Sequence, residues 1–494
     1  MGPLPTRWLI VIALAVSSLR AFGQAPSPPR IAAHSAQVPG LRRSIDRIVA
    51  APALERASWG VLVRSLDTDE TIYSMNPGKL MMPASALKVV TVAAAAERLG
   101  WNHAYETRVV ADGVVAGDTL DGNLVIVASG DPSLDRPTLD VWVSQLKALG
   151  ITRVTGTVLA DARAFSGEGL GFGWSWDDLA YYYAAPIAAA QFRENAVDLT
   201  LRPGPSAGTP PLYEITPAGI SGLRLDGRMT TGTATATPEF VARRAPGSPV
   251  VVLEGIVPAG SRPVSHPLSV HDPVRFLVEG FTEALRDGGI AVGAPLPADA
   301  SVDRTKDFAD ARLLLTHRSA PLSVLARRLM EVSQNQYSET LVKTMGAQAG
   351  NPTFEGGLKA EEALLASWGL APDAVVLRDG SGLSRYDYVT PDALVQVLSH
   401  MYRAPAHRGP FFSVLNIAGQ DGTIAARMKN TPAAGNARAK DGAMAGVRSL
   451  CGIVRTMDGE ALVFAVLANN FAAPASAVTT AIDAIIVQLA SFKR

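Results

Sequence analysis

The stretch Pro83-Ala84-Ser85-Ala86-Leu87-Lys88 opens an alanine-rich run that ends at Gly100. Because this run has no internal Gly or Pro, we expect a helix over residues 85–99. Positions three residues apart lie on one helix face, so the Lys88 amine can reach the Ser85 hydroxyl. A serine hydroxyl becomes a good nucleophile only when a base takes its proton. The pattern therefore makes Ser85 a candidate nucleophile and Lys88 its candidate base.

Two similar patterns elsewhere are weaker candidates. About one Ser-x-x-Lys should occur by chance in a chain with nine lysines, and a second copy is present at Ser144-Gln145-Leu146-Lys147. It lies in an amphipathic run whose polar residues we expect to face water. Gly204-Pro205-Ser206-Ala207-Gly208 matches Gly-x-Ser-x-Gly, but Thr209-Pro210-Pro211 follows and cannot open the helix that such a nucleophile needs. We expect a loop there.

Two further motifs supply the other groups that acyl transfer needs. Ser333-Gln334-Asn335 lies in a helical pattern, where its hydroxyl and amide could both face a cleft at a loop–helix edge. Lys440-Asp441-Gly442 leads into a β-rich run and offers a second lysine beside a glycine. Together with Ser85 and Lys88 these residues form a plausible acyl-transfer set. The plain alternative is that Ser333 and Asn335 are cap or turn residues and Lys440 is a solvated charge.

In this order the three motifs resemble the S-x-x-K, S-x-N and K-T-G motifs of the penicillin-binding proteins. Ser333 follows Ser85 by 248 residues and Lys440 follows Ser333 by 107. The long first gap is similar to the D-alanyl-D-alanine carboxypeptidase/endopeptidase family related to penicillin-binding protein 4, whose members carry a domain inserted there. Class A β-lactamases share the motifs with a much shorter gap. Four other runs agree with that family: residues 129–134, 192–198, 378–385 and 418–423.

The pattern along the chain predicts an α/β (α+β) architecture. Two hairpins are expected, over residues 59–73 and 447–467, with helices over 42–51, 323–346, 361–368 and 475–491. Short β-rich runs and Gly/Pro turns fill the middle of the chain. We expect a penicillin-binding/β-lactamase-like domain of helices and antiparallel sheet from residues 24–104 and 311–494, with a β-rich inserted domain at 105–310.

The resemblance implies roles for the site residues. Ser85 would attack the carbonyl of a D-Ala–X bond in peptidoglycan stem peptides, with Lys88 as general base. Burial and the nearby Lys440 would keep the Lys88 amine uncharged. Ser333 would pass a proton to the leaving nitrogen, and Asn335 would bind the substrate peptide. The oxyanion would lie between the N–H groups of Ser85 and Ala443, after Gly442. The resemblance implies β-lactams as covalent inhibitors and no metal or cofactor.

Asp441 departs from the family pattern, because a threonine is usual there and again at Ala443. A carboxylate at this position would repel a substrate carboxylate by roughly a few kcal/mol, unless it pairs with Lys440 or Arg448. Arg448 could also take over as the carboxylate partner. The protein would then be a carboxypeptidase that tolerates the change, or an enzyme favouring endopeptidase work. The alternative is a peptidoglycan-binding or penicillin-binding pseudoenzyme with little turnover, because Asp441 replaces the usual threonine. A β-lactamase fits the chain length poorly.

Composition and the amino-terminal sequence limit the class of protein and its cellular location. Forty-five basic and 45 acidic residues balance, which argues against a nucleic-acid binder. The single cysteine, Cys451, and seven unclustered histidines give no sign of a zinc site. Arg7 and a 12-residue apolar run predict a signal peptide over residues 1–23, too short for a membrane span. We expect export to the periplasm or cell envelope without a span after cleavage; the alternative is an uncleaved anchor.

Overall fold

The computed structural model describes residues 37–297, 299–302 and 306–494. The predicted signal peptide at residues 1–23 lies outside the described residues, so it stays a prediction. Within the described part of the chain, no helix combines the length and the apolar character that crossing a membrane requires.

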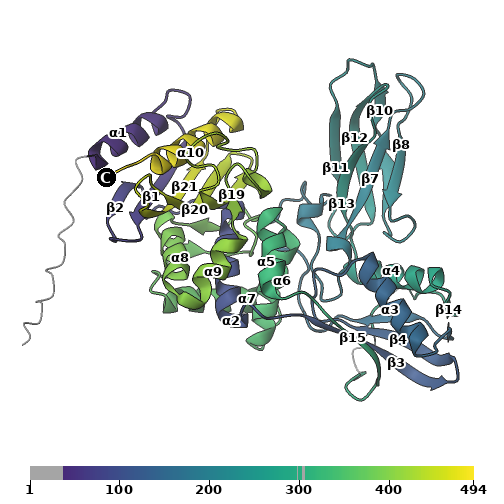
Figure 1. Cartoon of the computed structure of the whole chain (residues 1–494). Coiled ribbons are helices and arrows are strands. Elements are labelled where there is room, and N and C mark those ends of the chain that lie inside the picture. The colour runs from purple at the N-terminus through teal and green to yellow at the C-terminus, as the bar shows by residue number, and fades with distance from the viewer. Residues whose placement is uncertain (1–36, 298, 303–305) are drawn as a thin grey trace, which may run out of the picture. The chain divides into compact units, whose positions relative to one another are not determined.

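Both halves of the predicted catalytic domain contribute to one six-stranded antiparallel sheet (Figure 1). Its order is β18-β19-β20-β21-β1-β2, and both predicted hairpins are confirmed as β1–β2 and β20–β21. The strands are β1 (Ser58–Ser65), β2 (Thr71–Met75), β18 (Asn416–Ile417), β19 (Arg438–Met444), β20 (Val447–Arg455) and β21 (Ala461–Asn469).

Strand β21 is buried along its whole length because helices cover both faces of the sheet. Alternate residues point to opposite faces, so Leu462 and Phe464 pack in the cluster that contains α1 and α10. Val463 and Ala465 pack in the cluster that contains α2, α5 and α8. The helices of this domain are α1 (Val38–Val49), α2 (Lys88–Leu99), α5 (Leu322–Glu331), α6 (Asn335–Gln348), α7 (Phe354–Ser367), α8 (Pro391–Arg403), α9 (Pro405–Val414) and α10 (Ala475–Ala490).

Two predicted helices differ from the structure at the candidate motifs. The run from Ser85 begins as a 3-10 turn, Ala84–Leu87, and α2 starts only at Lys88. The helical pattern over 323–346 is broken into α5 and α6, because Ser333 adopts a left-handed conformation with φ 59°. The Gln334 side chain then caps α6 by accepting a hydrogen bond from the Gln336 N–H. Each break leaves a motif serine outside a regular α-helix.

The middle of the chain is rich in strands, and one hydrophobic cluster draws its members only from residues 109–315. Helices α3 (Arg136–Ala148) and α4 (Pro273–Asp287) pack within it. The domain limits 105 and 310 stay a prediction. The strands are β3 (Glu106–Ala116), β4 (Thr119–Val127), β5 (Arg153–Val154), β6 (Val158–Asp161), β7 (Ala196–Arg202), β8 (Leu212–Thr216), β9 (Arg224–Gly227), β10 (Thr230–Gly232), β11 (Glu239–Arg243), β12 (Val250–Pro258), β13 (Val264–Ser269), β14 (Ala291–Val292) and β15 (Arg312–Arg318); outside this cluster, β16 (Val375–Val376) pairs with β17 (Tyr388–Val389).

The two weaker serine patterns lie where the sequence places them. Ser206 is in the loop that follows β7. Ser144 is exposed on α3, where its hydroxyl donates to the Asp140 carbonyl. Neither serine has a lysine amine among its hydrogen-bond partners in the described residues.

Candidate active site

The chain before Ser85 is held by side chains from two strands of the sheet. The Asn469 amide clamps the backbone of Met82, accepting from its N–H at 2.7 Å and donating to its carbonyl at 3.1 Å. The Ser449 hydroxyl donates to the Pro83 carbonyl at 2.5 Å. Ala84 then takes a left-handed conformation with φ 47°. These contacts fix the direction from which Ser85 enters its turn.

Strand β19 passes close to this turn, and Gly442 is the residue that permits the approach. A Cβ added to Gly442 would lie 2.5 Å from the Pro83 oxygen and 2.9 Å from the Ala86 nitrogen. Both atoms belong to the backbone and cannot move aside cheaply, so a larger residue does not fit. The glycine of the third motif thus brings Lys440 and Ala443 to the edge of the Ser85 segment.

Lys88 is fully buried, and its amine makes three hydrogen bonds. The Nζ atom lies 2.9 Å from Ser85 Oγ, 2.7 Å from Asn335 Oδ1 and 2.9 Å from the Ser381 carbonyl oxygen. Burial, followed by the positive charge of Lys440, lowers the pKa of Lys88 to about 7, although Asp379 and Glu339 oppose the shift. Near neutral pH a large fraction of the amine is therefore uncharged.

The three partners of an uncharged Lys88 define where its lone pair points. A neutral amine has two N–H donors and one lone pair. The oxygens of Asn335 and Ser381 can only accept, so they take both N–H groups. The Ser85 hydroxyl is the one partner that can donate, and its Oγ lies 2.9 Å from Nζ. When the amine is uncharged, the hydroxyl hydrogen therefore points to the lone pair. This is the arrangement that a general base needs.

The second motif is split between two environments. The Asn335 amide, besides accepting from Lys88, donates to the Tyr183 carbonyl at 2.8 Å. Ser333 is half-buried, and among the described contacts its hydroxyl forms no hydrogen bond with Ser85, Lys88 or Lys440. The structure thus joins Asn335 to Lys88 directly and places Ser333 two residues away in the left-handed turn.

The turn that carries Ser333 is held by Glu194, which sequence reasoning assigned no role. Glu194 accepts from Gln334 Nε2 at 2.6 Å and from Arg328 Nε at 3.0 Å. Arg193, Glu194 and Asn195 are all left-handed, with φ of 50°, 56° and 54°. Such a conformation is unfavourable for residues other than glycine, so the surrounding contacts must enforce it.

The third motif places two opposite charges together. Lys440 is fully buried, and its Nζ donates to the Asp441 carbonyl at 2.7 Å and to Asp441 Oδ1 at 2.9 Å. Asp441 also accepts from the Thr423 hydroxyl. Burial alone would raise the pKa of Asp441, but Lys440, Thr423 and Arg427 lower it to about 2. Asp441 is therefore ionised at neutral pH and offsets the charge of Lys440.

Arg448, the other expected partner of Asp441, is engaged elsewhere. Its guanidinium donates to the carbonyls of Met444 and Val447 at 2.8 and 2.7 Å, which closes the β19–β20 turn. Of the two pairings considered for Asp441, the structure shows the one with Lys440. Among the described residues, the arginine that lies within 4 Å of Asp441 is Arg427, at 3.9 Å, and not Arg448.

A buried loop over residues 379–384 presents the Ser381 carbonyl to Lys88. Glu339 accepts from the N–H groups of Gly380 and Ser381 at 2.9 and 2.8 Å. Asp379 accepts from the N–H groups of Gly382 and Ser384 at 2.7 and 2.6 Å. The run 378–385 agreed with the family in sequence, but nothing in it indicated which acceptor the lysine would use.

One face of α6 connects the site to segments from the middle of the chain. Asn335, Glu339 and Lys343 are spaced by four residues and therefore lie on one side of the helix. Lys343 Nζ donates to the carbonyls of Ser166 and Glu168 at 2.9 and 2.7 Å. Across the described residues, no group of three His, Cys, Asp or Glu side chains is placed to hold a metal ion.

The chain is similar to known proteins in both sequence and fold. The chain is 34% identical over 478 residues to a D-alanyl-D-alanine carboxypeptidase of Actinomadura sp. (strain R39), covering 94% of this chain and 87% of the relative. It is 26% identical to the D-alanyl-D-alanine carboxypeptidase DacB of Haemophilus influenzae, covering 84% and 86%. The crystal structure of penicillin-binding protein 4 from that organism shares the fold, with a TM-score of 0.78 at 24% identity, covering 91% of this chain and 99% of that one.

The sequence also matches the D-Ala-D-Ala carboxypeptidase 3 (S13) family over residues 41–491. That range includes all three motifs and the whole strand-rich middle. The expected resemblance and the expected fold class are confirmed, and the chain belongs to the D-Ala-D-Ala carboxypeptidase 3 (S13) family.

Proposed function

We propose that this chain is an exported serine-type D-Ala-D-Ala carboxypeptidase and D,D-endopeptidase that acts on peptidoglycan stem peptides through an acyl-enzyme on Ser85. The observation that carries the proposal is the Lys88 amine, which is buried beside Lys440 and bonded to three oxygens. Only the oxygen of the Ser85 hydroxyl can also donate, so an uncharged Lys88 can accept the Ser85 proton.

In the first step, Ser85 Oγ attacks the carbonyl carbon of the D-Ala–X bond while its proton passes to Lys88 Nζ. The developing oxyanion is held by the N–H groups of Ser85 and Ala443, which backbone geometry supplies whatever the side chain at 443 is. The C–N bond then breaks, and the leaving nitrogen receives a proton through Ser333. A water molecule hydrolyses the ester and returns the serine.

The endopeptidase component of the proposal rests on Asp441. The Asp441 carboxylate forms an ion pair with Lys440, so the lysine attracts a free substrate carboxylate more weakly. A cross-linked stem has no free carboxylate at the scissile D-residue. The Asp441–Lys440 pairing therefore weakens its binding less than it weakens the binding of a substrate with a free carboxylate. Asn335 would exchange its Tyr183 contact for the substrate peptide.

A binding protein without turnover is disfavoured, because it has no need of an uncharged buried lysine.

Three substrates test the proposal. Purified protein is incubated with a fluorescent penicillin, a D-Ala-D-Ala pentapeptide and a cross-linked dimer. We expect labelling that the Ser85→Ala variant lacks, and faster cleavage of the dimer than of the pentapeptide. The crystallised H. influenzae penicillin-binding protein 4 was solved in complex with a β-lactam, which supports β-lactams as covalent inhibitors here. Absence of labelling and of cleavage would instead favour the pseudoenzyme.

A further inference from the structure

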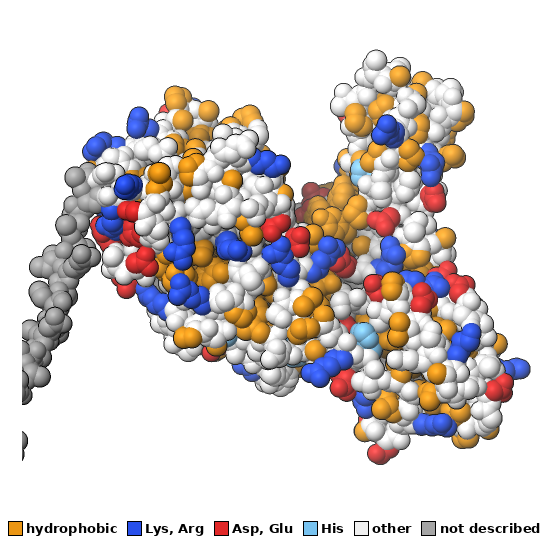
Figure 2. All heavy atoms as spheres, in the orientation of Figure 1, with side chains coloured by type: hydrophobic (Ala, Val, Ile, Leu, Met, Phe, Trp, Pro, Cys, Tyr) orange, Lys and Arg blue, Asp and Glu red, His pale blue; other side chains and the backbone are white. Residues whose placement is uncertain are grey.

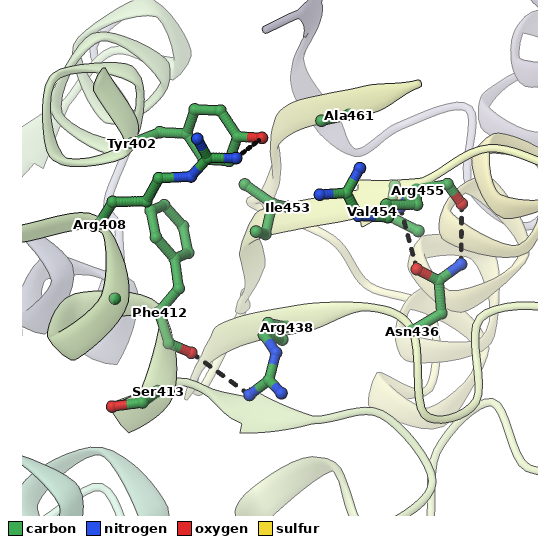
Figure 3. A pocket seen from close by; sticks show the side chains of 11 residues that line it. Tyr402, Arg408, Phe412, Ser413, Asn436, Arg438, Ile453, Val454, Arg455 and Ala461 are labelled. Atoms are coloured by element: carbon green, nitrogen blue, oxygen red, sulfur yellow. Dashed lines mark hydrogen bonds between the residues drawn. The ribbon is translucent and has the colours of Figure 1, made fainter. Parts of the chain in front are cut away.

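We propose that a pocket between α9 and strands β19 and β20 binds a ligand carrying two or more phosphate groups. The pocket has a volume of about 350 Å³ and shares no residue with the candidate active site. Its eleven lining residues include three arginines and no Asp or Glu (Figure 3): Arg408, Arg438 and Arg455, beside Tyr402, Phe412 and Ile453.

The strand register brings two of the arginines together. Arg438 on β19 lies directly opposite Ile453 on β20. Arg455 follows Ile453 by two residues and so projects from the same face of the sheet. Arg438 and Arg455 are therefore diagonal neighbours, about 7–8 Å apart at their backbones. Arg408 approaches from α9, with its guanidinium carbon 3.9 Å from the centre of the Tyr402 ring.

Each guanidinium is oriented by a neutral acceptor and not by a carboxylate. Arg408 donates to the Tyr402 hydroxyl, Arg438 to the Phe412 carbonyl at 3.4 Å and Arg455 to the Gly459 carbonyl at 2.9 Å. In the part of the chain that the structure describes, none of the three forms an ion pair. A guanidinium carries five N–H donors, so most donors at this pocket are open to a ligand.

Two other arginines of the same domain are paired with carboxylates instead. Arg427 pairs with Asp483 at 2.7 Å, and Arg494 pairs with Glu460 at 2.7 Å. Figure 2 shows basic side chains gathered over the region between α9 and the strands β19 and β20, with hydrophobic side chains exposed among them. Three like charges without a counter-charge repel one another, and a bound anion would remove that cost.

The shape and chemistry favour phosphate over other anions. The planar guanidinium fork matches two phosphate oxygens at once and is weakly hydrated. Two arginines on neighbouring strands and a third across the pocket suit adjacent phosphates better than a single one. Ile453 and Phe412 give the pocket an apolar surface, on which the part of the ligand that joins its phosphate groups can pack. A volume of about 350 Å³ lies within the range of small-molecule sites.

Calorimetric titration of the full chain tests the proposal. The probes are tripolyphosphate, a nucleoside diphosphate, a glycerol-phosphate oligomer and, as a non-phosphate anion, hexaglutamate. We expect the Arg438→Gln/Arg455→Gln double variant to bind tripolyphosphate at least about tenfold more weakly than the parent protein. The matched control is Arg202→Gln/Arg243→Gln, which removes the same charge from exposed ion pairs with Glu214 and Glu254. Its affinity should stay within about twofold.

The other probes separate the sources of the ligand. Tighter binding of the nucleoside diphosphate supports a soluble phosphate ligand, and tighter binding of the oligomer supports a phosphodiester polymer. The proposal is overturned if no phosphate probe binds, if hexaglutamate binds more tightly than all of them, or if both double variants lose affinity equally. Penicillin labelling of each variant checks that it is folded, since neither pair of substitutions touches the candidate active site.

Discussion

The amide of Asn335 accepts a hydrogen bond from Lys88 Nζ at 2.7 Å and donates one to the Tyr183 carbonyl at 2.8 Å. The second contact fixes which end of the amide faces the lysine, since only the oxygen can accept. Asn335 therefore does more than bind the substrate. Its amide oxygen and the Ser381 carbonyl accept hydrogen bonds from both N–H groups of an uncharged Lys88. The remaining lone pair is directed at Ser85.

The pH dependence of acylation should follow Lys88. Below its pKa of about 7 the amine is protonated and cannot take the Ser85 proton, so the rate constant for acylation by benzylpenicillin should rise with pH and level off above neutrality. Lys440→Gln removes a like charge that lowers this pKa, so the midpoint should move upward by about half a pH unit or more. Rate constants between pH 5 and 9 measure it. The exposed Lys429→Gln is the control, and a midpoint that stays or falls in Lys440→Gln would contradict this account.

Asp441→Thr should speed acylation by penicillin, by about three- to tenfold. The substitution removes a carboxylate that pairs with Lys440 and repels the carboxylate of the penicillin. Asp441→Asn is the matched control, because it removes the charge and nearly keeps the shape. If both variants are faster, charge is the cause; if Thr alone is faster, its hydroxyl contributes. An unchanged or slower Asp441→Thr enzyme would refute the role given to this position.

Glu194→Ala should slow acylation by about tenfold without weakening the initial binding of substrate. Glu194 is a positioning residue that holds Gln334, and through it the turn that carries Ser333. Glu194→Gln keeps an acceptor oxygen for Gln334 and should restore most of the rate, an effect that general destabilisation would not produce. Arg193→Gln is the control in the same turn, since Arg193 pairs with Asp198 instead. Separate values of kcat and KM decide the matter: a change confined to KM argues against positioning.

Glu339→Gln should lower Tm far more than Glu361→Gln, although burial first of all raises the pKa of both carboxyl groups to about 8. Both oxygens of Glu339 accept from backbone N–H groups of the 379–384 loop, and an amide NH₂ would face one of them. Leaving that donor unpaired costs about 1–3 kcal/mol. Glu361 accepts no backbone N–H among the described contacts, and glutamine mimics its protonated form. Thermal unfolding at pH 7 compares the two, and equal losses would count against the proposed loop contacts.

The contact between Ser85 and Lys88 could be predicted from the sequence because the two residues are only three positions apart. The spacing of Ser85 and Lys88 survives the change from the expected α-helix to a 3-10 turn, since residues i and i+3 lie on the same side of both helices, which have about 3.6 and about 3.0 residues per turn. The hairpins were predicted because polar turns separate apolar strands. The expected burial of Lys88 beside Lys440 and the Asp441–Lys440 pair also agree with the structure.

The remaining parts of the site depend on contacts between distant segments. Glu194 meets Gln334 across 140 residues, and Ser381 meets Lys88 across 293. Such pairs leave no periodic signal in one sequence. The left-handed turns at Arg193 and Ser333 were equally hidden, because tertiary contacts and not glycine enforce them. Arg448 was a natural candidate by proximity, but the turn carbonyls compete for its donors.

The most direct test of the central claim is the site of penicillin attachment. Trypsin cleavage after Lys79 and Lys88 releases residues 80–88, a peptide with Ser85 as its single hydroxyl-bearing residue. After incubation with benzylpenicillin and digestion, mass spectrometry should find one penicilloyl group on this peptide, and none anywhere in Ser85→Ala. A modification on another peptide, or an unmodified 80–88 peptide in a correctly folded protein, would contradict the assignment of Ser85 as the nucleophile.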